Sequence, residues 1–281
     1  MNSLLGAADV RRLAQELRVH PTKKWGQNFV IDPNTVRRIV RAGDVRADDT
    51  VLEVGPGLGS LTLALVETGA RVVAVEIDPV LAERLPRTID EFAPEFAEAV
   101  QVVPGDALRV SSLPMEPSML VANLPYNVAV PVVLHLLAAF PTIERMLVMV
   151  QREVADRLCA KPGSRTYGVP SAKIRWFGDV RYAGDVGRHV FWPAPNVDSG
   201  LVALVRRAAP EGVDRDAVFA VIDAAFSQRR KQLKSALAAC LGGGDRATAI
   251  LRAAGIDPSE RGEQLALVDF VAIAREAAKV E

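Results

Sequence analysis

The chain has 281 residues, 49% of them hydrophobic, which is enough to bury the cores of one large domain and a smaller one. Its formal net charge is zero, so global charge does not indicate a nucleic-acid partner, although local clusters still can. The two cysteines, Cys159 and Cys240, are far apart and lack metal-ligand spacing, which argues against a disulfide scaffold and against a zinc site.

The amino terminus and one long uncharged stretch indicate where in the cell the protein is expected. Residues 1–21 contain no long apolar region of the kind found in a secretory signal, and the cysteine usage fits a reducing compartment. Residues 117–143 carry no charge and are long enough to span a bilayer, but Pro125, Pro131 and Pro141 interrupt them. We therefore expect a cytoplasmic protein without a membrane span or a metal, acting as a monomer.

From residue 50 onward, short β-branched runs alternate with helical patterns. This alternation predicts parallel strands joined by crossover helices, with about seven strands in the sheet. The strands are expected in TVLEVG, RVVAVEID, VQVVPGDA, SMLVANLP and RMLVMVQ, and later near 173–180 and 200–206. Helices are expected at about 59–69, from 79, and at 130–139.

The stretch LEVGPGLGS places three alternating glycines, Gly55, Gly57 and Gly59, between the first of these strands and a helix. Missing side chains allow backbone amides to approach a ligand closely. A dinucleotide-binding fingerprint would have its third glycine at position 60, where this chain has Ser60. The spacing instead resembles the S-adenosylmethionine loop of Rossmann-like methyltransferases.

Two carboxylates mark the ends of the next two strands: Glu76 closes one, and Asp106 follows the other. Glu76 lies where a carboxylate can accept both ribose hydroxyls, and Asp106 lies where one can accept an adenine amino group. Each could also be ordinary, Glu76 as a solvated side chain and Asp106 as a helix cap. Three successive strand ends at one sheet edge favour a shared nucleoside pocket.

The stretch NLPYN begins at the end of the fourth strand, on the same edge of the sheet. The lone pair of adenine N6 is delocalised into the ring, so N6 attacks a sulfonium methyl slowly unless it is held and reshaped. The side-chain oxygen of Asn123 and the carbonyl of Leu124 can accept its two N–H groups, while Pro125 stiffens the turn. Tyr126 can stack on an extruded base, which is worth roughly 1–3 kcal/mol. Alternatively, Asn123 caps the helix at 130–139 and Tyr126 packs in the core.

The composition changes near residue 210, and the rest of the chain is alanine-rich and helical. We therefore predict a catalytic domain over 1–209 and a helical domain over 210–281.

Residues 216–241 show apolar positions at helical spacing, with Arg230, Lys231 and Lys234 on another face. Such a face is usually only solvated, but beside an adenine pocket it predicts contacts with RNA phosphates. The segment before the glycine loop is also rich in basic residues and is the alternative RNA-binding candidate.

Several segments together resemble the ribosomal RNA adenine N6-dimethyltransferases over nearly the whole chain. They are KKWGQNFV, EVGPGLGSLT, VEID, GDA, NLPYN, VFWPAPNVDSGLV and FSQRRKQLKSAL. Within the family, the chain is most similar to the bacterial members that dimethylate two adjacent adenosines in a hairpin loop near the 3′ end of 16S rRNA. The resemblance implies an α/β fold with a Rossmann-like class I methyltransferase sheet and a small C-terminal helical domain.

The resemblance also implies residue roles. The methyl donor, S-adenosylmethionine, would be bound by Asn28, Val30, Gly55, Glu76, Asp106 and Asn123. Phe191 would be the second aromatic ring that sandwiches the target adenine with Tyr126, although the neighbouring Trp192 could be the ring that stacks. The prolines after Trp192 fit a rigid loop that presents Phe191, and they fit a surface turn between two strands equally well.

We therefore predict an S-adenosylmethionine-dependent rRNA adenine dimethyltransferase whose partner is 16S rRNA in the assembling small ribosomal subunit. Two other functions compete with it. A large-subunit methylase of the erythromycin-resistance type uses the same chemistry, and a non-catalytic RNA-binding assembly factor could keep the fold. A nicotinamide dehydrogenase is disfavoured by Ser60 and by the lack of an evident catalytic histidine or tyrosine–lysine pair.

Overall fold

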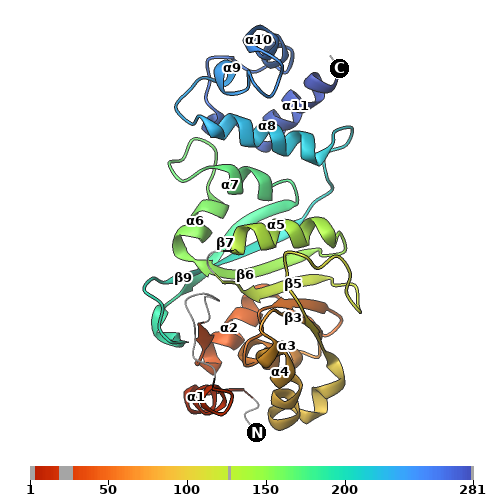
Figure 1. Ribbon diagram of the computed structural model, residues 1–281, viewed down its shortest axis with the longest axis vertical. Coiled ribbons are helices and arrows are strands. Elements are labelled where there is room, and N and C mark those ends of the chain that lie inside the picture. Colours follow the sequence, from red (N-terminus) through yellow and green to blue (C-terminus); the bar gives the residue numbers. More distant parts are fainter. Residues whose placement is uncertain (1–3, 19–27, 126–127, 280–281) are drawn as a thin grey trace. The chain divides into compact units, whose positions relative to one another are not determined.

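The computed structural model describes residues 4–18, 28–125 and 128–279, which form two compact units (Figure 1). Unit 1 consists of Met1–Ala155 and Arg181–Arg206, and unit 2 consists of Asp156–Val180 and Arg207–Glu281. The boundary expected near residue 210 lies close to the change of unit after Arg206.

Residues 156–180 were assigned to the first domain from the sequence, but in the structure they pack with unit 2. The rings of Trp176 and Phe177 meet Phe219 edge-on, with centroids 6.2 and 6.3 Å apart. The buried hydroxyl of Tyr167 donates to the carbonyl of Leu265 at 2.8 Å. Aromatic burial of this kind between segments distant in sequence leaves no local signal at the boundary.

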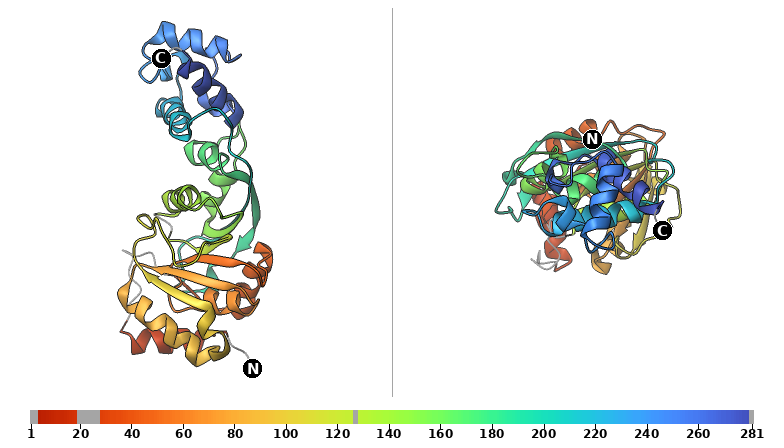
Figure 2. Two further views of the ribbon diagram at one scale, coloured as in Figure 1. Left: turned by 90° about the vertical axis from the view of Figure 1, so that its right-hand side faces the viewer. Right: turned by 90° about the horizontal axis from the view of Figure 1, so that it is seen from above.

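A seven-stranded sheet, as predicted, forms the centre of unit 1, and helices lie on both of its sides (Figures 1 and 2). Its strand order is β4-β3-β2-β5-β6-β9-β7; β2, β3, β4, β5 and β6 are parallel, and β9 runs antiparallel to β6. The strands are β2 (Thr50–Val54), β3 (Arg71–Glu76), β4 (Val100–Pro104), β5 (Met119–Asn123), β6 (Arg145–Gln151), β7 (Gly178–Val186) and β9 (Ser199–Arg206). The chain moves outward from β2 to β4 and then returns to β5, so the topological switch point lies between β2 and β5.

Two helices outside unit 2, α2 and α4, begin at aspartate caps. The Asp32 carboxylate accepts from two N–H groups at the start of α2, and the Asp78 carboxylate accepts from the Val80 N–H at the start of α4. Each aspartate is followed by a proline at the first helical position. The helices that begin outside unit 2 are α1 (Ala7–Glu16), α2 (Pro33–Gly43), α3 (Ser60–Val66), α4 (Pro79–Phe92), α5 (Ala129–Ala139) and α6 (Arg152–Cys159), the last of which ends in unit 2, with 3₁₀ turns η1 (Pro94–Ala99) and η2 (Arg188–Val190).

A second, two-stranded sheet was not predicted. It pairs β1 (Phe29–Val30) antiparallel with β8 (Phe191–Trp192), and the rings of Phe29 and Trp192 stack with centroids 6.4 Å apart. Two-residue strands are too short to produce a period-two pattern in the sequence. This sheet joins the segment before the glycine loop to the segment that carries Phe191.

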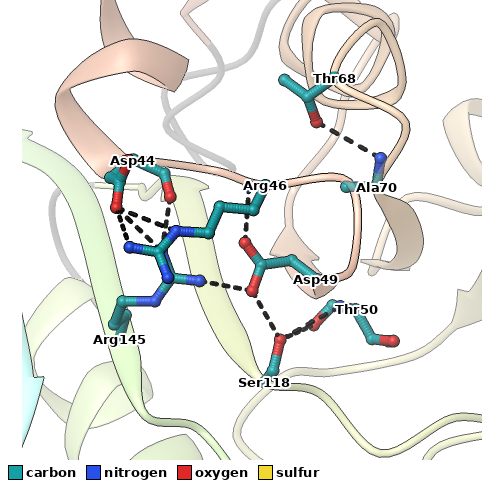
Figure 3. Close-up of polar contacts among 8 residues, drawn as sticks. All are labelled: Asp44, Arg46, Asp49, Thr50, Thr68, Ala70, Ser118 and Arg145. Atoms are coloured by element: carbon teal, nitrogen blue, oxygen red, sulfur yellow. Dashed lines mark hydrogen bonds and ion pairs between the residues drawn. The ribbon is translucent and has the colours of Figure 1, made fainter.

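At the amino ends of β2, β5 and β6, a polar cluster fastens neighbouring strands together (Figure 3). The carboxylate of Asp49 is 2.5 Å from the guanidinium of Arg145, and it also accepts bonds from the Ser118 hydroxyl and the Arg46 N–H. Burial opposes ionisation of Asp49, but these donors outweigh it and hold the pKa of Asp49 below its usual value. The cluster lies at the edge of the sheet opposite the predicted site.

Unit 2 is helical, and its elements differ from the prediction in two places. Residues 169–174 form a helix and the strand begins at Gly178, whereas a strand was expected over 173–180. The helical pattern over 216–241 is divided between two helices by a turn. The helices are α7 (Val169–Ile174), α8 (Arg215–Ser227), α9 (Leu233–Ala236), α10 (Gly244–Ala253) and α11 (Leu267–Ala278), with the 3₁₀ turn η3 (Gly262–Gln264). In the described parts of the chain, we find no helix with the length and apolarity needed to cross a membrane.

Candidate active site

A cavity of about 260 Å³ opens at the carboxyl ends of β2, β3 and β5, at the switch point of the sheet. Its lining includes all six residues predicted to bind the methyl donor and three of the predicted catalytic positions, with Asn123 in both sets: Asn28, Val30, Gly55, Glu76, Asp106, Asn123, Leu124 and Pro125. Residues from positions 28 to 125 thus meet at one place.

The glycine loop bends as its sequence suggests. Gly55, Gly57 and Gly59 have φ angles of +66°, +60° and +97°, which residues other than glycine rarely adopt. A Cβ atom on Gly57 would also lie 2.9 Å from the ring of Phe29. The loop therefore lies close under the β1 segment, and the two together form one wall of the cavity.

Glu76, the last residue of β3, is 4% exposed and holds the glycine loop in place. One carboxylate oxygen accepts from the Gly57 N–H at 3.0 Å, and the other accepts from the Asp78 N–H at 3.0 Å. Burial raises the pKa of Glu76, while these N–H donors act against that rise. Each oxygen has a second lone pair, so the carboxylate can still accept hydroxyl groups from a ligand.

Asp106 follows β4 and has an ordinary structural role besides lining the cavity. One of its oxygens accepts from the Leu108 N–H at 2.9 Å, which closes a short turn, and its side chain is 37% exposed. The guanidinium of Arg109 lies 3.8 Å from the other oxygen. The Asp106 carboxylate thus accepts one hydrogen bond within the protein and still lines the cavity, where a ligand can contact it.

Asn123 closes β5, and its side chain is not used to cap α5. Its amide nitrogen donates to the carbonyl of Asn28 at 3.1 Å, and α5 begins without a side-chain cap. Leu124 is buried and donates its N–H to Met149, and Pro125 accepts from the Val128 N–H at 3.2 Å. The alternative in which Asn123 is a helix cap is therefore wrong. Tyr126 lies outside the described residues.

Phe191 does not contribute to the described cavity lining. Its side chain is 3% exposed and belongs to the hydrophobic core beneath the β1–β8 sheet. Trp192 is partly exposed but stacks on Phe29. The structure therefore brings Asn123, Leu124 and Pro125 together with the residues predicted to bind the donor. Phe191 pairs with Val30 through the backbone, but its side chain is not part of the described cavity lining.

Glu53 is a cavity residue that sequence reasoning missed. It lies in β2, is 1% exposed, and accepts a hydrogen bond of 2.7 Å from the Thr62 hydroxyl. Burial raises its pKa to about 8, the Thr62 bond opposes that rise, and the nearby charge of Glu76 adds to it. A single carboxylate inside the run TVLEVG was the available signal, since buried strands seldom carry an ionisable residue without a role.

The predicted RNA-binding residues lie in unit 2, and all three are exposed. Arg230 and Lys231 occupy the turn between α8 and α9, and Lys234 lies in α9. The neighbouring Arg229 is 2.8 Å from both the Glu263 carboxylate and the Arg165 carbonyl, which fixes the turn. Within the described ranges, no three His, Cys, Asp or Glu side chains are arranged to hold a metal ion.

Comparisons with known proteins place these features in a family context. A family model described as ribosomal RNA adenine dimethylase matches residues 20–279. The ribosomal RNA small subunit methyltransferase A of Thermobifida fusca is 63% identical over 273 residues, covering 96% of this chain and 95% of that protein. The protein of the same name from Streptomyces griseus is 61% identical, covering 99% of this chain and 97% of that protein.

Two solved structures share the fold. A dimethyladenosine transferase from Plasmodium falciparum superposes with a TM-score of 0.76 at 23% identity, covering 87% of this chain and 95% of that one. The 23S rRNA methyltransferase ErmE superposes with a TM-score of 0.67 at 27% identity, covering 89% of this chain and 100% of that one. These likenesses confirm the predicted fold class.

Proposed function

Because the chain belongs to the ribosomal RNA adenine dimethylase family and is therefore an rRNA adenine methyltransferase, we propose that its substrate is 16S rRNA. It transfers methyl groups from S-adenosylmethionine to N6 of two adjacent adenosines in a hairpin loop near the 3′ end, within the assembling small subunit in the cytoplasm. The small-subunit names of relatives at 61% and 63% identity support this substrate.

The charge of the cavity is the observation that best supports the methyl donor. Its described lining includes three carboxyl groups, on Glu53, Glu76 and Asp106, and no lysine, arginine or histidine. S-adenosylmethionine supplies a methyl group on a cationic sulfonium, which an acidic cavity stabilises.

The cavity residues divide the binding of the donor among them. Glu76 accepts the ribose hydroxyls with its remaining lone pairs, and Asp106 accepts the adenine amino group. Gly55 leaves room for close approach of the ligand to the backbone, while Asn28 and Val30 close the cavity from the β1 side. These contacts use both the carboxylates and the left-handed turns of the glycine loop.

The target adenine is held by the residues after β5. The Asn123 side-chain oxygen and the Leu124 carbonyl accept the two N6–H groups, which directs the nitrogen lone pair at the methyl group. Pro125 keeps the turn rigid, and alignment in the closed site supplies most of the rate increase. No strong general base is needed, because the proton can leave N6 after the transfer.

The aromatic contacts of the base are a separate part of this proposal. Tyr126 follows Pro125 directly and is placed by sequence to stack on the extruded base. Phe191 is buried in the structure, so its contact with the base requires a shift of the β1–β8 segment. Trp192, which is partly exposed, is the alternative ring.

Binding of the RNA backbone is assigned to unit 2. Arg230, Lys231 and Lys234 are exposed on a turn and a short helix that neighbouring contacts hold in place. Three cations that are free to reach solvent suit phosphate contacts, which dominate the affinity of proteins for nucleic acids. The enzyme acts as a monomer in this proposal.

Two alternative functions have less support. A large-subunit methylase is supported only by the likeness to ErmE at 27% identity. A non-catalytic assembly factor would have no need for the Asn123 amide at the edge of an acidic cavity.

An asparagine substitution tests the assignment. Asn123→Ala is expected to keep the fold and to lower single-turnover methylation of small subunits by roughly 10²-fold, the scale of one lost transition-state contact. The matched control is Asn34→Ala, at an exposed position on α2, which should leave the rate unchanged. An unchanged rate in a folded Asn123→Ala variant would show that N6 is held in another way.

A further inference from the structure

The orientation of the Asn123 amide is fixed by a main-chain group. Its nitrogen lies 3.1 Å from the carbonyl oxygen of Asn28. A carbonyl can only accept a hydrogen bond, so the NH₂ end of the amide must face Asn28 and the oxygen must face away from it. An amide turned by 180° would place two oxygens against each other. The Asn28 carbonyl thus determines which end of Asn123 is available to a substrate.

The position of Asn28 depends in turn on a very short strand. β1 contains only Phe29 and Val30, and it is paired with β8 on one side. Just beyond it, the Ile31 N–H donates to the Val190 carbonyl at 2.8 Å. Two residues of ladder give little rigidity alone, so other contacts must decide where β1 lies.

Ser60 supplies such a contact from the cavity side. Its hydroxyl donates to the Val30 carbonyl at 2.8 Å, and its side chain is 7% exposed. Ser60 is the first residue of α3 and follows directly on the glycine loop. The loop that lies under the donor site is therefore tied to the strand that orients Asn123, through one hydroxyl and one carbonyl.

The hydroxyl of Ser60 has no role in starting its own helix. α3 begins after Gly59 in a left-handed conformation, without a side-chain cap, and the Ser60 hydroxyl is directed at another segment. Alanine has a higher helix propensity than serine, so α3 itself should tolerate the loss of the hydroxyl. What such a change removes is the tie to β1.

We propose that Ser60 is a positioning residue for methyl transfer, which holds β1 so that the Asn28 carbonyl keeps the Asn123 amide oxygen turned toward the adenine. This role rests on the proposed function of Asn123. It explains why position 60 carries a hydroxyl where a dinucleotide-binding loop has glycine. Ser60 touches neither the adenine nor the methyl group in this account and acts only through Asn28 and Asn123.

A double-mutant cycle tests the proposal. Single-turnover methylation of small subunits at saturating S-adenosylmethionine would be measured for the wild type, Ser60→Ala, Asn123→Ala and the double variant. A displacement of the reacting groups by a fraction of an ångström should slow the Ser60→Ala variant by about 10-fold. In the Asn123→Ala background, the Ser60→Ala substitution should slow methylation by less than about 2-fold, because the effects of substitutions at residues that act through one another are not additive.

Two further measurements separate positioning from general damage. The calorimetric dissociation constant for S-adenosylmethionine should change less than about 3-fold in Ser60→Ala, and Ser60→Thr, which keeps the hydroxyl, should restore the rate to within about 2-fold of the wild type. If Ser60→Ala does not fold, Ser60→Cys replaces it in the cycle, since a thiol is a weak donor of similar size.

The outcomes are distinguishable. The positioning role would be overturned if Ser60→Ala slowed methylation equally in the wild-type and Asn123→Ala backgrounds. It would also be overturned if the rate of the Ser60→Ala single variant stayed within about 2-fold of the wild type. Either result would leave the proposed function intact. An unchanged rate in Asn123→Ala would instead overturn the role of Asn123, and the positioning role with it.

Discussion

The hydroxyl of Thr62 lies 2.7 Å from the carboxylate of Glu53, which lines the cavity, and both side chains are shielded from solvent. Burial raises the pKa of Glu53 to about 8, with a further contribution from the charge of Glu76. At neutral pH the Glu53 side chain is therefore mainly a neutral carboxylic acid before a cation binds.

The first prediction is a pH dependence of stability that comes from Glu53. Its pKa is about 8 in the fold and 4.5 in the unfolded chain, so between these values the folded state binds more protons. The free energy of unfolding should then fall as pH rises, with a slope of about 1.4 kcal/mol per pH unit from this one group. Urea unfolding at pH 5, 6, 7 and 8 gives the free energy of unfolding of the wild type and of Glu53→Gln, and the variant should lack this slope. If the free energies of the two proteins change in parallel with pH, Glu53 is ionised in the fold.

The second prediction concerns the Asp49–Arg145 pair at the opposite edge of the sheet (Figure 3). Because the pKa of Asp49 is lowered, its stabilising effect is present above pH 3.8 and is lost as the pH falls further. Arg145→Gln leaves a carboxylate that is 5% exposed without its guanidinium partner, which should cost about 3 kcal/mol near neutral pH.

Arg46→Gln is the control for that pair, because the ion pair of Arg46 with Asp44 has side chains 60% and 69% exposed. Exposed pairs contribute little, so its cost should stay below about 0.5 kcal/mol. Chemical denaturation at pH 7 measures both variants. Equal losses would contradict a special role for the buried pair.

The third prediction concerns donor binding by Glu76. Glu76→Ala removes the acceptor for the Gly57 N–H and the proposed acceptor for the ribose hydroxyls together. Calorimetric affinity for S-adenosylmethionine should fall by about 10²-fold or more, the scale of two lost hydrogen bonds to a charged group. Glu83→Ala, on an exposed face of α4, should bind as the wild type does, and neither variant should bind NAD. Tight binding of NAD would contradict the donor assignment.

The fourth prediction concerns the three exposed cations of unit 2. If Arg230, Lys231 and Lys234 contact phosphates, replacing all three with alanine should weaken binding to small subunits. The slope of log K against log salt should shrink by about 0.7 to 0.9 for each lost contact. A charge-preserving triple variant, with lysine and arginine exchanged at each position, should keep most of the slope. A full slope in the folded alanine variant would leave the basic amino-terminal segment as the RNA-binding candidate.

The sequence predicts that four residues meet at one cavity, because parallel strands impose that geometry. Gly55, Glu76, Asp106 and Asn123 each lie at or just beyond the end of a strand, and the carboxyl ends of parallel strands meet at one edge of the sheet. Strand ends alone were therefore sufficient to place these four residues around a common space.

Contacts between distant short segments were not predictable in the same way. The bond from Ser60 to Val30 and the burial of Phe191 depend on two-residue strands that carry no periodic signal. The turn at residues 228–232 likewise divides a pattern of apolar spacing that a continuous helix would fit equally well. In each case tertiary packing, not local preference, decides the conformation.

The central claim is that this enzyme methylates adenine N6 in small-subunit rRNA, and mapping its products tests that most directly. Small and large ribosomal subunits lacking their own adenine methylation would be incubated with the enzyme and S-adenosylmethionine, and the modified nucleotides located by mass spectrometry. We expect N6,N6-dimethyladenosine at two adjacent positions in a hairpin loop near the 3′ end of 16S rRNA, and none in the large subunit. Methylation confined to 23S rRNA, or no methylation of either subunit, would contradict the account.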